Sequence, residues 1–368
     1  MNGITAPIVT TDRPDAEYLT AALARSGQSD TSRGEPLVEP LHGGRTGVAV
    51  SRLQSQSDTR YVLKQIPRTR AIGEALGHEG EGMAWLQNLT RSLPRPLMNP
   101  ALDVALNIRR DEWWLLMTDV SAGVQSRAQW GEDHTRRLFE ALADFHALWW
   151  EADNGKSDCL ASLSQTTGVL AEVARYVTRG STTTPWAARV AKEFQVPAML
   201  LPDFLSAAGE DNASFYNRLL ARWPQLVDRL NDHPATLLHG DLRRANIAFV
   251  DHDIALFDWE FVARGPAAVD LTWHWFLHFW AYPPNDGCTV EDRWWLRDAY
   301  LSRLEKNLRF PLDVRAFLAS WDLGWLRVFC QLGFVLADGL SDQRQVRTEL
   351  IRKAFEHARR IAHEHLAD

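Results

Sequence analysis

The chain has 368 residues, of which 45% are hydrophobic and 24% charged, as is typical of a soluble protein of two or three domains with a large buried core. Its net charge of −7 and the lack of an apolar run near the roughly 18 to 20 residues that span a bilayer exclude nucleic acid and membranes as expected partners. The three cysteines, Cys159, Cys288 and Cys330, form no C-x-x-C pair, so we expect a reducing cytoplasm and neither a disulfide framework nor a zinc ribbon.

The first 36 residues are expected to form a helix and a loop that extend the protein at its N-terminus. The opening stretch lacks the basic and apolar regions of a secretion signal. Residues 12–25 have the spacing of an amphipathic helix, with Asp12 near the N-cap and Pro14 in the first turn. A polar loop follows over residues 26–36.

Residues 37–119 predict a small sheet domain with one helix. A strand pair broken by Gly43, Gly44 and Gly47 precedes a third strand, "RYVLKQI". Helical spacing then runs from Ile72 to Leu93, and "EWWLLMTDV" at 112–120 reads as a buried strand that enters a polar connection.

Residues 120–368 predict a mostly helical domain, in which only 247–257 has the pattern of strands. The helices are expected from apolar residues at i, i+3 and i+4. They cover "TRRLFEALADFHALWW", "FYNRLLARWPQLVDRL", "VDLTWHWFLHFWAY", "WWLRDAYLSRL", "VRAFLASWDLGWLRVFCQLGFVLADGL" and "TELIRKAFEHARRIAHEHL".

Polar residues flank a predicted hairpin at 247–257, made of strands Ile247–Val250 and Ile254–Phe257. Asn246 precedes the first strand and Asp258 follows the second, so their side chains are expected about 5 Å apart across the ladder. Oxygen ligands of this kind suit Mg²⁺. Asp241 enters the same place and could accept a proton from an attacking hydroxyl. Each residue alone could be a turn former, but the combination indicates a site.

These residues carry a family resemblance. H-G-D-x-x-x-x-N at 239–246, then Asp-Trp-Glu at 258–260 and "GPAAVDL" at 265–271, resemble the aminoglycoside phosphotransferase and choline kinase group, whose fold is protein-kinase-like. The resemblance implies a bilobal α+β fold with ATP or GTP as phosphoryl donor. It implies Asp241 as the catalytic base, Asn246 and Asp258 as Mg²⁺ ligands, and His239 and Asp270 as residues that position the catalytic loop.

Lys64 is either an edge lysine or the residue that holds the α- and β-phosphates. A helix with acids follows it, and Glu79 shares a stripe with Met83 and Leu86 at i, i+4 and i+7. We therefore choose Glu79 as its partner over Glu74 and Glu81, and the family resemblance agrees.

Two backbone segments are expected to complete the nucleotide site. Gly43 and Gly44, with Arg45 and Thr46, could cover the phosphates, although glycines of this kind also serve in ordinary hairpin turns. The backbone from Met117 to Asp119 would meet the purine. The sequence does not distinguish ATP from GTP.

Three features depart from the family pattern. Arg243 and Arg244, between the Asp and the Asn, either contact the γ-phosphate or are solvated. The residue after Asp258 is Trp, and the glycine of the D-F-G motif is missing, which favours small-molecule kinases over protein kinases. His274 and His278 have no Glu in an H-E-x-x-H arrangement, so no zinc site is expected.

We therefore expect an enzyme that transfers the γ-phosphoryl group to a hydroxyl of a small molecule such as an aminoglycoside, sugar or amino alcohol. Its acceptor could be cationic and held by acids, or it could stack on the Trp-rich segment 269–282. The acids available are Glu151, Asp153, Asp203, Glu210 and Asp211. The alternative is a pseudokinase that acts through a protein partner, against which the complete set of expected site residues argues. The oligomeric state and the metabolic, biosynthetic or resistance role stay open.

Overall fold

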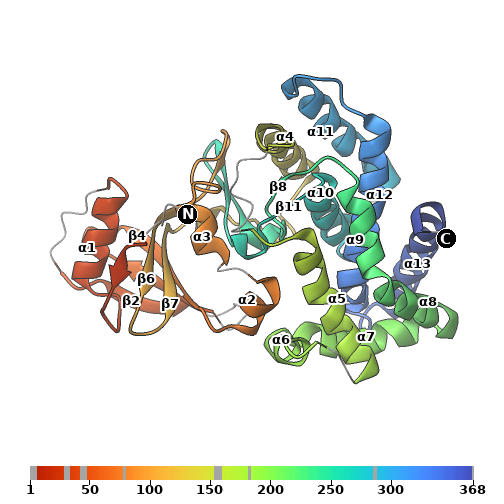
Figure 1. The fold of residues 1–368 in the computed structure, drawn as a ribbon, viewed down its shortest axis with the longest axis horizontal. Coiled ribbons are helices and arrows are strands. Elements are labelled where there is room, and N and C mark those ends of the chain that lie inside the picture. Colours follow the sequence, from red (N-terminus) through yellow and green to blue (C-terminus); the bar gives the residue numbers. More distant parts are fainter. Residues whose placement is uncertain are drawn as a thin grey trace.

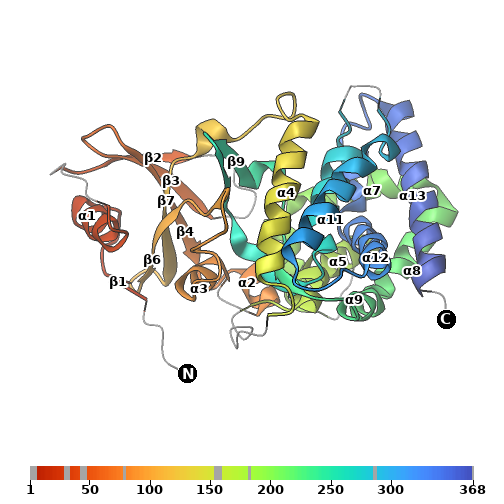
Figure 2. The same ribbon diagram turned by 90° about the horizontal axis from the view of Figure 1, so that it is seen from above.

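The computed structural model describes residues 6–28, 34–41, 48–77, 80–152, 160–180, 184–284 and 288–366. The chain forms two lobes that lie side by side, a smaller one built on a sheet and a larger one that is mostly helical (Figures 1 and 2). This arrangement confirms the predicted bilobal α+β fold. The first lobe comes from the chain up to about Thr118, and the second from the remainder.

The first lobe holds a six-stranded sheet in the order β1-β6-β7-β4-β3-β2. All of its pairs are antiparallel except β1 with β6. Its strands are β1 (Ile8–Val9), β2 (Leu37–Leu41), β3 (Ala49–Gln54), β4 (Arg60–Pro67), β6 (Ala101–Asn107) and β7 (Glu112–Thr118), and its helices are α1 (Ala16–Arg25), α2 (Ala71–Leu76) and α3 (Gly80–Leu86). The strands predicted at 60–66 and 112–120 are therefore present.

Alternate residues of the central strands face opposite sides of this sheet, because successive side chains of a strand point in opposite directions. On one side Leu63 packs in a cluster with Tyr18 of α1. On the other side Leu115 packs in a cluster with Trp85 of α3. Lys64 follows Leu63 and so lies on the α3 side, where a carboxylate from α3 can reach it.

The N-terminal segment joins the first lobe directly. β1 pairs with β6, and Tyr18 of α1 contacts Trp114 edge to face at 4.8 Å. The helix begins at Ala16 and its N-cap is Asp15, whose side chain accepts from the Tyr18 N–H at 2.8 Å. The prediction of Asp12 as the cap was wrong by three residues, because Asp12 and Pro14 precede the first helical turn.

The helix predicted from Ile72 to Leu93 is two short helices. α2 ends at Leu76, and left-handed conformations follow at Gly77 (φ 67°), just after α2, and at Gly80 (φ 65°), the first residue of α3. Only glycine adopts such angles without a steric penalty. The two glycines therefore reset the helical phase, so that residues before and after the break share no common stripe.

The second lobe contains the helices that the apolar spacing predicted, but three of those stretches are divided, two of them where the α-helix gives way to a π-helix at Phe276 or to a 3₁₀ helix at Gly333. The "FYNRLLARWPQLVDRL" stretch divides between α8 and α9, where Pro224 occupies the first turn of the new helix. The helices are α4 (Glu132–Leu148), α5 (Leu163–Arg179), α6 (Ala187–Glu193), α7 (Gln195–Ala208), α8 (Glu210–Ala221), α9 (Trp223–Asn231), α10 (Ala268–Trp275), α11 (Trp294–Asn307), α12 (Val314–Leu332) and α13 (Arg344–Leu366). Among the described helices, none has the length and apolar character needed to cross a membrane.

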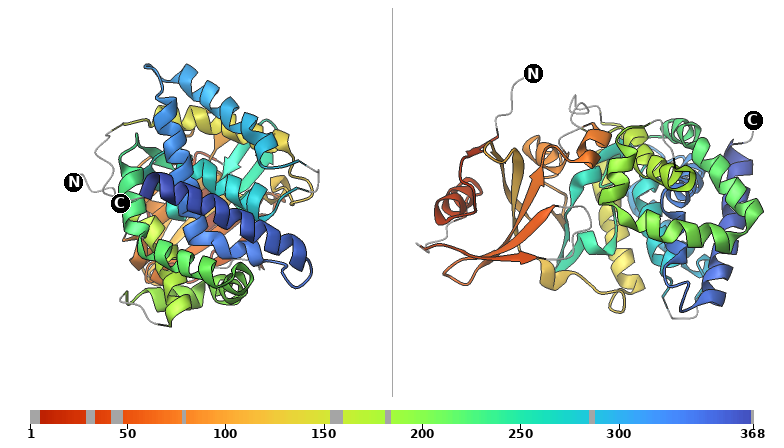
Figure 3. Two further views of the ribbon diagram at one scale, coloured as in Figure 1. Left: turned by 90° about the vertical axis from the view of Figure 1, so that its right-hand side faces the viewer. Right: turned by 90° about the horizontal axis from the view of Figure 1, so that it is seen from below.

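Short strands and single-turn helices connect these elements. The strands are β5 (Leu97–Met98), β8 (Thr236–Leu238), β9 (Ile247–Val250), β10 (Asp253–Leu256) and β11 (Ala263–Gly265). The 3₁₀ helices are η1 (Ser121–Gly123), η3 (Arg244–Asn246), η4 (Trp259–Phe261), η6 (Glu291–Arg293) and η7 (Gly333–Ala337). α10 continues into a π-helix, η5 (Phe276–Ala281). Seen from the end of the second lobe, α13 lies across the face that points away from the sheet (Figure 3).

Most tryptophans of the predicted stacking segment 269–282 are part of the core instead. Trp275 is 1% exposed and stacks on Trp294 at 5.3 Å. Trp280 packs against Trp325 at 5.0 Å. The expected stacking surface for the acceptor is therefore not found on these two rings, because they fill the space between α10, α11 and α12.

His274 gives the stability of the second lobe a predictable dependence on pH. Burial lowers the pKa of His274 to about 4, below the 6.5 of a free histidine, so the folded protein binds fewer protons between these values. The stability that depends on a neutral His274 is fully present above pH 6.5 and is lost as the pH falls towards 4. We expect wild type to lose about 3 kcal/mol of unfolding free energy through this residue over that range.

Urea unfolding at pH 4.5, 5.5 and 7.5 checks this expectation. His274→Gln should flatten the pH dependence, whereas the matched replacement of the exposed His363, His363→Gln, should leave it as in wild type. Identical pH profiles for wild type and His274→Gln would contradict the assignment.

Candidate active site

The loop after β8 carries the H-G-D sequence and is held from behind by one buried carboxylate. Asp270, fully buried at the start of α10, accepts the backbone N–H of His239 at 2.7 Å and of Gly240 at 2.8 Å. Gly240 has φ 83°, and a Cβ there would lie 2.1 Å from the Phe261 carbonyl oxygen. The loop therefore requires glycine at this position, and its shape is fixed by Asp270.

His239 links the loop to the end of the hairpin. Its Nδ1 accepts from the Asp241 N–H at 3.3 Å, so its Nε2 carries the proton and donates to the Phe257 carbonyl at 3.0 Å. The ring also packs on Trp259, with centroids 4.5 Å apart. Both nitrogens are thus used in holding the loop, and the imidazole points at the protein's own backbone.

Two hydrogen-bond donors and one guanidinium surround the Asp241 carboxylate. Trp273 Nε1 donates to Oδ1 at 3.0 Å, and Asn246 Nδ2 donates to Oδ2 at 2.9 Å. Arg243 Nε lies 3.0 Å from the same Oδ2 as an ion pair. These contacts orient the carboxylate. Trp273 was missed as a site residue from the sequence, where it appears as one of several aromatics on an apolar helix.

The hairpin brings Asn246 and Asp258 close together, but the two residues are not directly opposite each other in the strand register. β9 spans the predicted residues, while β10 begins and ends one residue earlier than predicted. The Phe257 N–H donates to the Asn246 carbonyl at 3.2 Å, so Asp258 lies one residue beyond the position opposite Asn246. Asp258 is left-handed (φ 66°, ψ 57°), a conformation that Asp and Asn tolerate better than most residues and that is common where a functional side chain is held.

Lys64 lies between two carboxylates. Its Nζ is 2.7 Å from Glu81 Oε2 and 2.5 Å from Asp258 Oδ1. Burial disfavours the ammonium charge, but Asp258 and Glu81 outweigh it and raise the pKa of Lys64. Conversely, although burial opposes ionisation of Asp258, Lys64 and Arg243 hold the pKa of that carboxyl well below its usual range.

The partner of Lys64 on α3 is Glu81, which corrects the choice of Glu79. Glu79 lies outside the described residues, and the reasoning that selected it required one continuous helix from residue 72. α3 instead begins at Gly80, and its helical phase differs from that of α2. Glu81 therefore faces the interior and is only 3% exposed. The glycines that weakened the helical pattern are the physical reason for the error.

We expect Glu81→Gln to lower kcat/KM for the nucleotide by at least about tenfold, because Lys64, the residue expected to hold the phosphates, loses the partner that fixes its position. Glu74→Gln is the matched control, since Glu74 is exposed and pairs with Arg189. Steady-state kinetics of both variants at varied nucleotide concentration make the comparison. An equal effect of the two changes would contradict the Lys64–Glu81 assignment.

A second ion pair lies beside the first and was not recognised in the sequence. Arg70, at the start of α2, pairs with Glu260 of η4. Burial raises the pKa of Glu260, although Arg70 and Lys64 act in the opposite direction. A cavity of about 560 Å³ is lined by these side chains together with Lys64 and Glu81. The pair connects α2 to the segment that follows Asp258.

The nucleotide-site residues expected in the first lobe are only partly described. Gly43, Gly44, Arg45 and Thr46 lie outside the described residues. Met117 is buried near the end of β7. Asp119 accepts from Arg52 Nε at 2.9 Å and from the Ser121 N–H at 3.0 Å, so its side chain supports the connection between the lobes.

The acids considered for a cationic acceptor do not share a location with Asp241. Asp203 on α7, and Glu210 and Asp211 on α8, are exposed on helices at the side of the second lobe away from the sheet (Figures 1 and 2). Glu151 is exposed just after α4, and Asp153 lies outside the described residues. These residues are best explained as solvated surface.

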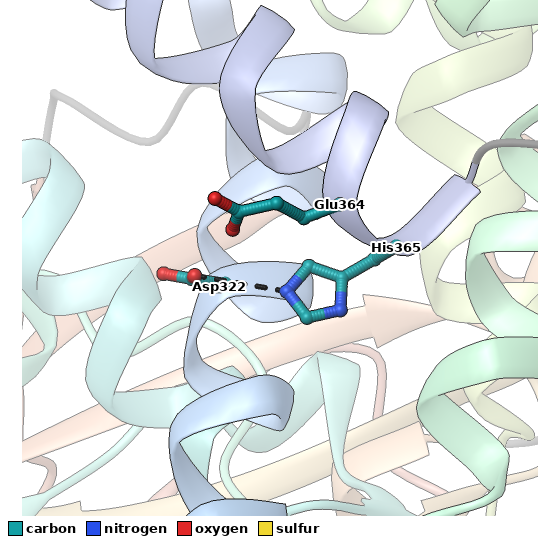
Figure 4. Close-up of side chains that lie close together, drawn as sticks. All are labelled: Asp322, Glu364 and His365. Carbon is teal, nitrogen blue, oxygen red and sulfur yellow. Dashed lines mark ion pairs between the residues drawn. The ribbon is translucent and has the colours of Figure 1, made fainter.

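A cluster of metal-ligand side chains lies on α12 and α13, far from the catalytic loop in sequence. Asp322, Glu364 and His365 come close together there (Figure 4). Arg360 forms ion pairs with Asp322 at 3.5 Å and with Glu364 at 2.7 Å. One guanidinium thus pairs with both carboxylates, so the cluster is explained as an ion-pair network between the two helices.

Trp273→Phe should lower kcat about tenfold to a hundredfold, since it removes a hydrogen bond to a charged carboxylate, and should leave the nucleotide KM unchanged. Trp275→Phe is the control, because that ring packs in the core and does not contact Asp241. Both variants should lose some stability on thermal unfolding, but only Trp273→Phe should lose kcat. A parallel loss of kcat in both would assign Trp273 a purely structural role.

The two lobes, the H-G-D loop and the lysine–glutamate pair define a protein-kinase-like phosphotransferase. The chain belongs to the phosphotransferase enzyme family, whose model matches residues 38–313. No curated protein matches the chain.

Several solved structures resemble the chain distantly. Amicoumacin kinase hAmiN is 14% identical with a TM-score of 0.49, and the match covers 87% of each chain. Spectinomycin phosphotransferase APH(9)-Ia is 11% identical with a TM-score of 0.49, covering 95% of this chain and 99% of that one. Ethanolamine kinase of Plasmodium vivax is 11% identical with a TM-score of 0.49, covering 87% and 82%. At such identities these similarities say nothing about the substrate of this chain.

Proposed function

We propose that this protein transfers the γ-phosphoryl group of ATP or GTP to a hydroxyl group of a small molecule. The observation that carries the proposal is one connected cluster: Asp241 contacts Asn246 and Arg243, Arg243 approaches Asp258 at 3.6 Å, and Asp258 contacts Lys64. A phosphoryl-transfer site needs a base, a metal-binding pair and a phosphate-binding cation close together. All of these groups are present here.

The donor set at Asn246 and Asp258 fits Mg²⁺, which prefers amide and carboxylate oxygens. The Lys64 ammonium, 2.5 Å from Asp258, supports the fit, since a cation already lies against this carboxylate. We propose that Asn246 and Asp258 hold the metal ion. When bound, Mg²⁺ would neutralise negative charge on the nucleotide phosphates.

The protein's own residues account for the remaining tasks. Asp241 takes the proton of the acceptor hydroxyl as that oxygen bonds to the γ-phosphorus and the bond to the β-phosphate oxygen breaks. Trp273 and Asn246 keep the carboxylate oriented for this step. Lys64, braced by Glu81, holds the phosphates, and Asp270 fixes the loop from behind. Catalysis then rests on positioning and on charge compensation.

Two alternatives receive less support. A pseudokinase could lose any of Lys64, Asp241, Asn246 or Asp258 without penalty, yet all four are present and in contact with one another or with a shared neighbour. A protein kinase has an Ala-Pro-Glu activation segment after its metal aspartate. Here the chain runs from Asp258 through η4 and β11 directly into α10.

Calorimetric titration of ATP and of GTP, with and without Mg²⁺, tests the proposal. We expect binding of one or both nucleotides that depends on Mg²⁺, followed by release of ADP or GDP when hydroxyl compounds are supplied. No binding of either nucleotide to folded protein would overturn it and would favour a protein-binding role.

A further inference from the structure

Two adjacent arginines of the catalytic loop face opposite surroundings. The charges that act on Arg243 are those of Asp241, Asp258 and Glu260, and they raise its pKa. Arg244 is half-buried, and its pKa is lowered by burial and then by the positive charge of Arg127. Arg243 therefore belongs to the proposed phosphate side of Asp241. Arg244 instead has Arg127 and Tyr282 as its titratable neighbours, and the carbonyl of Leu242, two residues before it, lies 3.2 Å from His274 Nδ1.

Tyr282, a neighbour of Arg244, is contacted by two further arginines from segments distant in sequence. Arg127 follows the connection between the lobes, and its Nη2 donates to the Pro283 carbonyl at 3.0 Å. Arg347 of α13 donates from Nη1 to the Ala281 carbonyl at 2.5 Å. Both guanidiniums lie over the Tyr282 ring, at 5.4 Å and 5.9 Å from its centroid.

This arginine cluster, defined as Arg127, Arg244 and Arg347, lacks neutralising partners. None of the three forms an ion pair with a carboxylate anywhere in the described ranges. The nearby acid is Asp338, which is exposed and accepts the Tyr282 hydroxyl at 2.7 Å. Burial and then Arg127 lower the pKa of Arg347, although Asp338 opposes the effect. Guanidiniums that repel one another in this way are typical of a site that binds an anion.

A second observation points to a ligand at the same place. His278 is 3% exposed, and within the described parts of the chain neither of its ring nitrogens has a hydrogen-bond partner. Buried polar groups are almost always partnered, by protein or by bound molecules. His278 belongs to η5, and π-helical turns are rare and frequent at functional sites. The His278 ring lies 5.5 Å from that of His274, whose Nδ1 is 3.2 Å from the carbonyl of Leu242 in the catalytic loop, so His278 is close to this loop.

We propose that the phosphoryl acceptor carries an anionic group, a carboxylate or a phosphate, which binds to Arg127, Arg244 and Arg347 while its hydroxyl is presented to Asp241. This inference rests on the proposed function, because it assigns the acceptor class of that same site. Arg244 is three residues from Asp241 on one short loop, so an acceptor held by its guanidinium lies close to the base.

The charge of the site separates this class from cationic acceptors. An aminoglycoside or amino alcohol would meet three guanidiniums that form no ion pair with a described carboxylate, and would be repelled. The acids that could have held such a cation lie elsewhere, on α7 and α8. A free phosphate ester and a sugar acid share the chemistry that the cluster recognises.

Inorganic sulfate is a probe of the cluster that does not depend on the shape of the acceptor. We would titrate it by calorimetry into protein saturated with Mg²⁺ and a non-hydrolysable nucleotide analogue, so that the phosphate side is already occupied. Arg127→Gln and Arg244→Gln should each weaken sulfate binding about tenfold or more. Arg352→Gln is the matched control, since it removes the same charge from an exposed position on α13. Sulfate binding that is absent, or equal in all four proteins, would overturn the inference.

The acceptor class is then tested by turnover of compounds with similar carbon skeletons and different charges. One set is glucuronate, glucose and glucosamine, and the other is glycerate and glycerol. We expect the anionic member to be preferred, with the preference reduced in Arg127→Gln. Preference for the cationic or neutral member would overturn the acceptor class. If neither ATP nor GTP bound, the proposed function would be overturned instead. Sulfate titration without nucleotide would still decide whether the arginine cluster binds anions.

Discussion

Asp241→Ala is expected to lower kcat by about 10² to 10⁴-fold, the usual contribution of a positioned base. The carboxylate is held on both oxygens, by Trp273 on one and by Asn246 and Arg243 on the other. Removing it eliminates the proton acceptor and leaves these donors without their common partner. Mg²⁺-dependent nucleotide binding should change little, because Asn246, Asp258 and Lys64 stay in place.

Turnover and calorimetry on the same preparation separate these two effects. Asp228→Ala is a suitable control, since Asp228 is exposed on α9 and its replacement removes the same charge. Wild-type turnover by Asp241→Ala would show that another group accepts the proton. Loss of nucleotide binding together with turnover would show that the substitution had disturbed the loop.

Asp258→Asn is expected to weaken Mg²⁺-dependent nucleotide binding about tenfold to a hundredfold. The change preserves size and suits the left-handed backbone at this position, so its effect should come from the lost charge. Lys64 would lose one of its two carboxylate partners at the same time. Titration at several Mg²⁺ concentrations should therefore show a weakened metal dependence as well as weaker binding.

Asp251→Asn offers the same chemical change at the other end of the hairpin. Asp251 also has positive φ (52°) and is exposed. Its replacement should leave the titration curves as in wild type. If Asp258→Asn bound the nucleotide with unchanged Mg²⁺ dependence, the metal ligand would have to be assigned to another residue.

The sequence carried enough information for the fold class and for the segment from residue 237 to 271. That segment is short and continuous, so the sequence positions of His239, Asp241, Asn246 and Asp258 are enough to indicate that these residues lie near one another in the fold. Strand β9 was predicted with its observed bounds and β10 with an error of one residue. Local geometry is sufficient here because the hairpin brings the ends of neighbouring strands together.

Contacts between distant segments could not be predicted in the same way. The choice of Glu79 failed because two glycines interrupt the helix, and their left-handed angles are a property of the folded backbone. Trp273 is 32 residues from Asp241, and nothing in its spacing distinguishes it from Trp275, which packs in the core. The arginine cluster joins the lobe connection, the catalytic loop and α13, so only the three-dimensional arrangement reveals it.

Two of the links between the lobes end on the β9–β10 hairpin. β5 pairs with β10 only a few residues before the chain enters β6 of the first lobe, and Val124, after β7, bridges to Ala248 of β9. Asp258 follows this hairpin directly, so a rotation of the lobes about the hairpin would displace Asp258 less than Lys64, which β4 carries with the sheet. Such a rotation would chiefly change the gap between this lysine and this aspartate, the pair that we propose as part of the nucleotide site.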